Sequence, residues 1–124
     1  MIGSTRAVRV FAYTQPTDMR KGFLGLEGLV RNELGRDLLE GDLFLFVSRN
    51  RRRSKVLFFD GTGLVIYMKR LEVGRFAALR QADGPLRMTM SELALFLEGS
   101  ELAGRVSLSP RALRLKDLAS FSRA

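Results

Sequence analysis

The sequence predicts a small α+β domain in which an antiparallel β-meander is packed by two main helices. Three β-rich segments lie close together and are joined by short polar or glycine-rich turns. Two other segments carry apolar residues at helical spacing. The length of 124 residues and the hydrophobic fraction of 46% suffice for one core. We therefore expect a single domain over residues 1–104 and a C-terminal helical extension over residues 105–124.

The first predicted elements are a strand and a helix. Ala7–Tyr13 alternates and is rich in β-formers, which indicates a strand. Apolar residues at steps of three to four then predict an amphipathic helix over Met19–Leu34. Thr17 or Asp18 is a suitable N-cap for this helix, and Gly35 is a suitable residue just after its end.

The meander is predicted from three strands that follow this helix. They are Leu43–Ser48, Lys55–Asp60 and Leu64–Arg70. A loop that holds several arginines joins the first two, and Gly61–Gly63 joins the second and third as a tight turn. Several positions are apolar on both faces, so we expect helix to cover part of this sheet.

A short strand and a second helix follow the meander. Leu86–Met88 is consistent with a short strand, and Thr89–Glu92 fits the capping box T-x-x-E. We expect the helix over Ser91–Glu98 to stop at Gly99. In the extension, Ser109-Pro110 resembles an N-cap followed by proline at the first helical position.

The composition excludes several kinds of chemistry. The chain contains no histidine and no cysteine. It therefore has no zinc site of the usual nitrogen and sulfur type, no cysteine nucleophile, no disulfide and no Ser-His-Asp triad. We expect no metal, no cofactor and no enzymatic activity. The sequence also has no apolar run of secretory-signal or membrane-spanning length, and we expect a cytoplasmic location.

The positive charge is concentrated in one stretch. The formal net charge is +8, and residues 49–80 contain nine basic and two acidic residues. The cluster from Arg49 to Lys55 suits phosphate oxygens, because arginine offers a planar fork and a permanent charge. Alternatively, it is a solvated loop that protects a sheet edge. The candidate nucleic-acid-binding residues are Arg49, Arg51, Arg52, Arg53, Lys55, Lys69, Arg70 and Arg75.

A second basic feature precedes the first predicted helix. Arg20 and Lys21, beside the free amides of a helix N-terminus, would form a phosphate site. Alternatively, they pair with Asp18 or point to solvent. The carboxylates Asp18, Asp60 and Glu72 have no spacing that supports a metal-dependent nuclease, since each has a simpler role as a cap, a turn residue or an ion-pair partner.

Four phenylalanines lie in the strands of the predicted meander. Phe44, Phe46, Phe58 and Phe59 could stack on bases. Aromatic residues inside strands more often belong to the core.

Several segments, in order, resemble one family. These are PTDMRKGF at residues 16–23, LFLF at 43–46, KVLFFDGTG at 55–63, YMKRLE followed by GRF within 67–76, and the helix ending LEG at 97–99. They resemble the small TnpB (Orf2-type) accessory proteins of insertion-sequence family sixty-six. The similarity spans about Val8 to Gly99.

The resemblance implies an accessory protein that assists a separate DDE-type transposase in transposition. It carries no catalytic residue onto this chain. We expect a DNA-binding accessory factor that grips phosphates with the arginine loop and can contact the transposase. A protein-interaction module that regulates the transposase, and a small basic nuclease or RNA-directed toxin, remain the alternatives.

Overall fold

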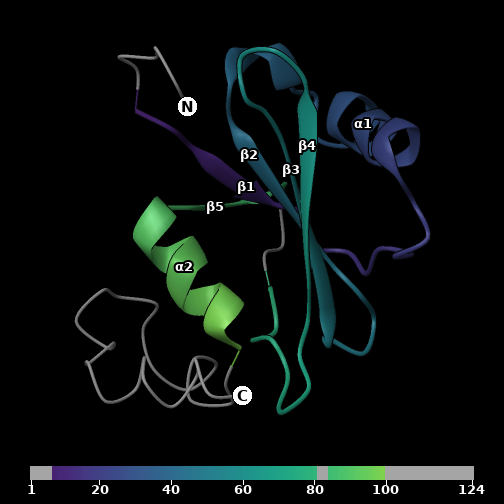
Figure 1. Ribbon diagram of the computed structural model, residues 1–124, viewed down its shortest axis with the longest axis vertical. Coiled ribbons are helices and arrows are strands. Elements are labelled where there is room, and N and C mark those ends of the chain that lie inside the picture. Colours follow the sequence, from purple (N-terminus) through teal and green to yellow (C-terminus); the bar gives the residue numbers. More distant parts are fainter. Residues whose placement is uncertain (1–6, 81–83, 100–124) are drawn as a thin grey trace.

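The structure is a computed structural model that describes residues 7–80 and 84–99. The fold is an α+β domain built on a five-stranded sheet in the order β4-β3-β2-β1-β5 (Figure 1). The strands are β1 (Val10–Ala12), β2 (Leu43–Val47), β3 (Arg53–Phe59), β4 (Leu64–Arg70) and β5 (Leu86–Met88). The helices are α1 (Phe23–Asn32), the short 3₁₀ helix η1 (Leu38–Glu40) and α2 (Met90–Glu98).

The predicted meander of β2, β3 and β4 is confirmed, and it is extended by two further strands. β1 pairs with β2 in parallel, and β5 pairs with β1 in the antiparallel direction. As a result, the C-terminal ends of β1, β2 and β4 lie at the same end of the sheet as the N-terminal end of β3. The β3–β4 turn lies at the opposite end, at the top of Figure 1.

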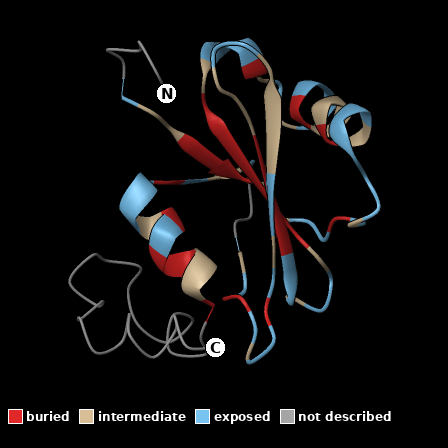
Figure 2. Cartoon of the chain, viewed as in Figure 1, coloured by how far each residue is buried: buried red, intermediate tan, exposed pale blue. Residues whose placement is uncertain are grey.

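Both faces of the sheet are covered, which explains the strands that are apolar on both sides. The face under α1 buries Leu26 and Val30 against Phe44, Phe46 and other side chains. The opposite face carries α2, with aromatic contacts between Phe76 and Phe96 at a ring-centroid distance of 5.2 Å. Figure 2 shows the buried residues concentrated along β1 and β2.

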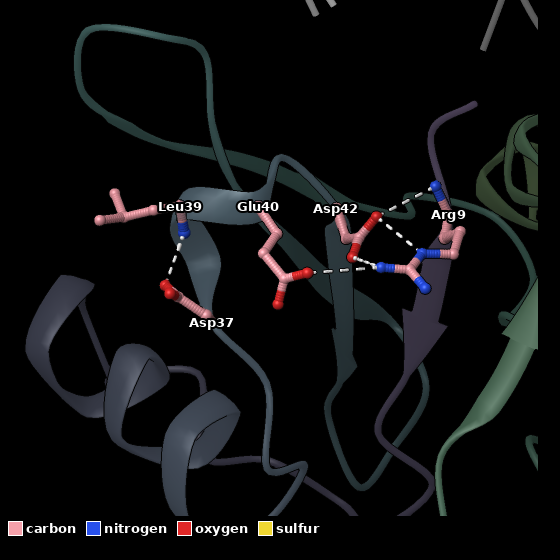
Figure 3. A network of polar contacts seen from close by, with 5 residues as sticks. All are labelled: Arg9, Asp37, Leu39, Glu40 and Asp42. Atoms are coloured by element: carbon pink, nitrogen blue, oxygen red, sulfur yellow. Dashed lines mark hydrogen bonds and ion pairs between the residues drawn. The ribbon is translucent and has the colours of Figure 1, made fainter. Parts of the chain in front are cut away.

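A buried ion pair joins the starts of the two parallel strands (Figure 3). Asp42, which precedes β2, is 1% exposed and accepts hydrogen bonds from Arg9 Nε at 3.2 Å and Nη2 at 2.9 Å. Its Oδ1 also accepts the Arg9 backbone N–H at 3.3 Å. These bonds to Asp42 raise the pKa of Arg9 above its ordinary value. The pair satisfies the buried carboxylate and fixes the register of β1 against β2.

The first helix begins later than the sequence pattern predicts. It starts at Phe23 after Gly22, so neither Thr17 nor Asp18 is its N-cap. The carboxylate of Asp18 instead accepts the Arg20 N–H at 2.9 Å and closes a local turn. Regular helix ends at Asn32, and Gly35 adopts a left-handed φ of +63° just beyond it.

The other elements follow the prediction closely. β3 begins two residues earlier than expected, and β1 is shorter than Ala7–Tyr13. The capping box of Thr89 and Glu92 is confirmed, as is the end of α2 at Gly99. The predicted extension over residues 105–124 lies outside the described residues. No helix within the described residues is long and apolar enough to cross a membrane.

The Asp42→Ala variant should be less stable by about 2–3 kcal/mol, because it removes three hydrogen bonds between Arg9 and a buried carboxylate and leaves the guanidinium with Glu40, at 3.8 Å, as its ion-pair partner. Urea unfolding followed by circular dichroism would measure the loss. Glu27→Ala is the control, since Glu27 makes only an exposed 4.0 Å contact with Arg31 and should change stability by less than about 0.5 kcal/mol. Equal losses in the two variants would contradict this role of the buried pair.

Candidate nucleic-acid interface

Three basic segments that are far apart in the sequence meet at one end of the sheet. We call residues 16–22, 48–55 and 69–76 together the basic end. Thr17 N–H donates to Val47 O at 2.9 Å, and Leu71 N–H donates to Arg52 O at 2.7 Å. Phe76 N–H donates to Arg51 O, also at 2.7 Å. The basic end contains ten lysines and arginines and only two carboxylates.

The β2–β3 turn at the centre of this end is held by short polar side chains. Ser48 Oγ donates to Asn50 Oδ1 at 2.8 Å and accepts the Arg53 N–H at 3.1 Å. Asn50 Oδ1 also accepts the Arg52 N–H at 3.0 Å. The roles of Ser48 and Asn50 were not predicted, although Ser-x-Asn beside a strand end is a recognisable turn signal. The turn presents Arg49 and Arg52 to solvent.

Two arginines of the turn region have different roles. Arg51 adopts a left-handed φ of +59°, and its Nη1 donates to Phe76 O at 3.2 Å. This half-buried side chain therefore fastens the turn to the segment that follows β4. Arg53 is already part of β3 and is exposed.

Lys55 is a correction to the predicted contact set. It lies within β3, is 8% exposed, and its ammonium donates to Lys21 O at 2.7 Å. The ammonium is thus committed inside the fold, between the sheet and the segment that precedes α1. Lys55 brings two of the basic segments together, but it does not face a ligand at the surface.

Like charges face each other across β3 and β4. Arg53 and Arg70 are direct partners in the β3–β4 register. The neighbouring residues Arg52 and Leu71 form a hydrogen-bonded pair. Because the two types of pair alternate along an antiparallel ladder, Arg53 and Arg70 form a non-hydrogen-bonded pair, in which the side chains lie closer together. Two cations placed in this way destabilise a sheet. Glu72 offsets part of this repulsion through Arg70 Nε at 2.8 Å, but both of these side chains are more than 60% exposed.

The remaining predicted cations lie around this pair. Lys69 precedes Arg70 and pairs in register with Ser54, so its side chain lies on the face of α2. Arg75 is exposed in the segment after β4. The structure therefore brings the predicted residues to one end of the sheet but distributes them over both faces.

The predicted phosphate site before α1 does not form in the expected way. The free amides of α1 begin after Gly22, while the backbone N–H groups of Arg20 and Lys21 already donate to Asp18. Arg20 Nη2 also lies 2.7 Å from Asp18 Oδ2. The guanidinium and backbone of Arg20 lower the pKa of Asp18 from 3.8 to about 2. The alternative in which Arg20 pairs with Asp18 is thus the one observed.

A hollow of about 150 Å³ opens at the basic end. It lies between the chain leaving β1 at Tyr13–Pro16, the turn at Val47–Arg51, and the segment Ala77–Leu79. Arg49 and Arg51 are the cations in its wall. The hollow was not predicted from the sequence, because it depends on the parallel pairing of β1 with β2.

The carboxylates considered for metal binding do not come together. Asp18 is bound to Arg20 and Glu72 to Arg70, whereas Asp60 lies in the β3–β4 turn at the far end of the sheet. No group of three potential metal ligands occurs within the described residues. Phe44 and Phe46 are fully buried, as expected for core residues.

Comparison with known proteins adds a family assignment. The profile of the family described as IS66 Orf2-like protein matches residues 8–106. Two relatives from Sinorhizobium fredii, named uncharacterized protein y4jC and uncharacterized protein y4hO, are 37% and 36% identical over 99 residues. Each alignment covers 80% of this chain and 85% or 86% of the relative. No solved structure matches the chain.

Removing the Arg20 guanidinium should raise the pKa of Asp18. In the Arg20→Gln variant we expect the value to rise from about 2 toward 3.8, but to stay below 3.8 because the backbone bond remains. NMR titration of the side-chain carboxyl carbons would measure the change. Since the folded pKa lies below the unfolded one, the Asp18–Arg20 pair stabilises the wild-type fold above about pH 4, and this contribution is lost as pH falls through 2.

Asp60 supplies an internal control in the same titration. Its pKa is lowered by the backbone N–H groups of Thr62 and Gly63, at the other end of the sheet, and should not move in this variant. An unchanged Asp18 pKa in the variant would contradict the pairing.

Proposed function

The chain belongs to the IS66 Orf2-like family, and we propose that it serves transposition as an accessory protein that binds DNA phosphates through the basic end. The observation that carries this proposal is the concentration of ten cations against two carboxylates in three segments held together by backbone bonds. A fold that only needed solubility would spread its charge, whereas a concentrated positive field attracts a polyanion.

The contact set that we propose is smaller than the predicted one. Arg51 and Lys55 are committed to carbonyl oxygens, and Arg20 is paired with a carboxylate. The exposed arginines left for phosphate oxygens are Arg49, Arg52, Arg53, Arg75 and Arg70, which also contacts Glu72; Lys21 is exposed as well.

The pair of Arg53 and Arg70 supports an anion as the ligand. Their mutual repulsion is a cost that the free protein carries in its sheet. A phosphate between them would relieve this repulsion and would also accept hydrogen bonds from both guanidinium groups. Within this end of the protein, Glu72 is the carboxylate that a phosphate would have to displace or accommodate at Arg70.

Binding to duplex DNA should depend steeply on salt. If the five exposed arginines each neutralise one phosphate, the plot of log K against log salt should have a slope of about −4.5. The triple variant Arg49→Gln, Arg52→Gln, Arg53→Gln should reduce the slope to about −2 by the same rule. Fluorescence anisotropy with labelled duplex DNA, single-stranded DNA and RNA, at several salt concentrations, would measure these values.

Arg31→Gln is the matched control for charge removal. Arg31 is 66% exposed on α1 and lines a separate hollow beside Phe59 and Gly63, away from the basic end. For the Arg31→Gln variant, the slope of log K against log salt should equal that of the wild type. A wild-type protein that binds none of the three nucleic acids at low salt would overturn the proposal and would favour an acidic protein surface as the partner.

A further inference from the structure

Strand β4 forms an open edge of the sheet. Of the described residues, only those of β3 pair with it. The bonds from Asp60 N to Gly63 O and from Leu71 N to Arg52 O fix the phase of the β3–β4 ladder. Odd-numbered residues of β4 therefore bond to β3, and the backbone groups of Leu64, Ile66, Met68 and Arg70 point outward from the sheet.

The edge also exposes apolar side chains at its centre. Tyr67 is 49% exposed and Met68 is 61% exposed, and they project to opposite faces of the sheet. The cations Lys69 and Arg70 lie only at the C-terminal end of the strand. An edge with a long, apolar middle and unpaired backbone groups is suited to strand addition.

We propose that two copies of the chain pair through β4, antiparallel and about a two-fold axis at Tyr67. In this register Tyr67 faces Tyr67 of the second copy, and Ile66 faces Met68. Leu64 faces Arg70, and Val65 faces Lys69. The two sheets become one continuous sheet of ten strands.

Three features make β4 complementary to a second copy of itself in this register and orientation. The residues whose backbone N–H and C=O groups point outward all have even numbers. Pairing Ile66 with Met68, and Leu64 with Arg70, therefore lets these groups hydrogen-bond to one another across the two copies. This centre also pairs all seven residues of β4, which registers centred on Ile66 or Met68 do not. Finally, antiparallel pairing sets each cation opposite an apolar residue, whereas parallel pairing would set Lys69 and Arg70 against their own copies.

The dimer stands independently of the proposed DNA binding, but it has a consequence for it. Because β4 ends at the basic end, antiparallel pairing sends the two basic ends in opposite directions along the combined sheet. A dimer would thus present two separate phosphate-binding surfaces.

Sedimentation equilibrium of the wild-type protein tests the pairing directly. We expect a concentration-dependent dimer in the micromolar range, without nucleic acid. The Met68→Pro variant removes one outward N–H while leaving the ladder with β3 intact, and it should weaken the dimer at least tenfold. A monomer at all concentrations up to 200 µM would overturn the proposal, and the edge would then suit an extended segment of a different protein.

Cysteine cross-linking tests the register and does not rely on the proline variant folding. The chain has no cysteine of its own. Tyr67→Cys places two thiols in facing positions of a closer, non-hydrogen-bonded pair, within reach of a disulfide, so this variant should oxidise to a covalent dimer. Met68→Cys is the control: its site is more exposed, but it faces Ile66 of the second copy. Equal cross-linking of the two variants would overturn the register.

Discussion

The direction of the strands is the constraint on which the basic end depends. β1 and β2 run in parallel, while β3 and β4 alternate, so three strands end where β3 begins. The segments that follow or precede these strand ends must then lie side by side, however far apart they are in the sequence. The Arg9–Asp42 pair at the other end of β1 and β2 holds the parallel pairing in place. Without that pairing, the segment at residues 16–22 would not reach Val47 or Lys55.

The basic end departs from what stability alone would select. Arg53 faces Arg70 in the register, a lysine ammonium is buried at Lys55, and Arg51 adopts a left-handed backbone conformation. Each feature costs some stability, and each is offset locally by a carboxylate or by carbonyl oxygens. Destabilising features that gather in one place are characteristic of functional sites, where residues are selected for binding rather than for stability.

Much of the fold could be predicted from short-range signals. The meander follows from β-rich runs separated by short turns, and α2 follows from the capping box of Thr89 and Glu92. The start of α1 was mispredicted because an aspartate such as Asp18 can either cap a helix or close a local turn, here by accepting the backbone N–H of Arg20. The position of β2 favours the turn. The backbone N–H of Thr17 donates to Val47 O, so the chain still runs alongside the end of β2 at this point and the helix begins only afterwards.

The site was predicted in composition but not in geometry. Counting charges along the sequence places the positive stretch between Arg49 and Arg80. The count cannot distinguish a solvent-exposed guanidinium, such as that of Arg49, from a buried ammonium bonded to a carbonyl oxygen, such as that of Lys55. The burial of Lys55, which was predicted as a surface contact, could not be foreseen because it depends on a partner 34 positions away, at Lys21. The hollow beside Arg49 likewise requires three segments whose proximity arises only from long-range strand pairing.

The most direct measurement is an NMR titration of the ¹⁵N-labelled protein with a short duplex DNA at low salt. If the basic end binds phosphate, amide shifts should concentrate in residues 48–53 and 70–76. The amides of residues 60–63, at the opposite end of the sheet, should stay in place. Shifts that spread evenly over the surface, or that gather around the β3–β4 turn, would contradict the proposal.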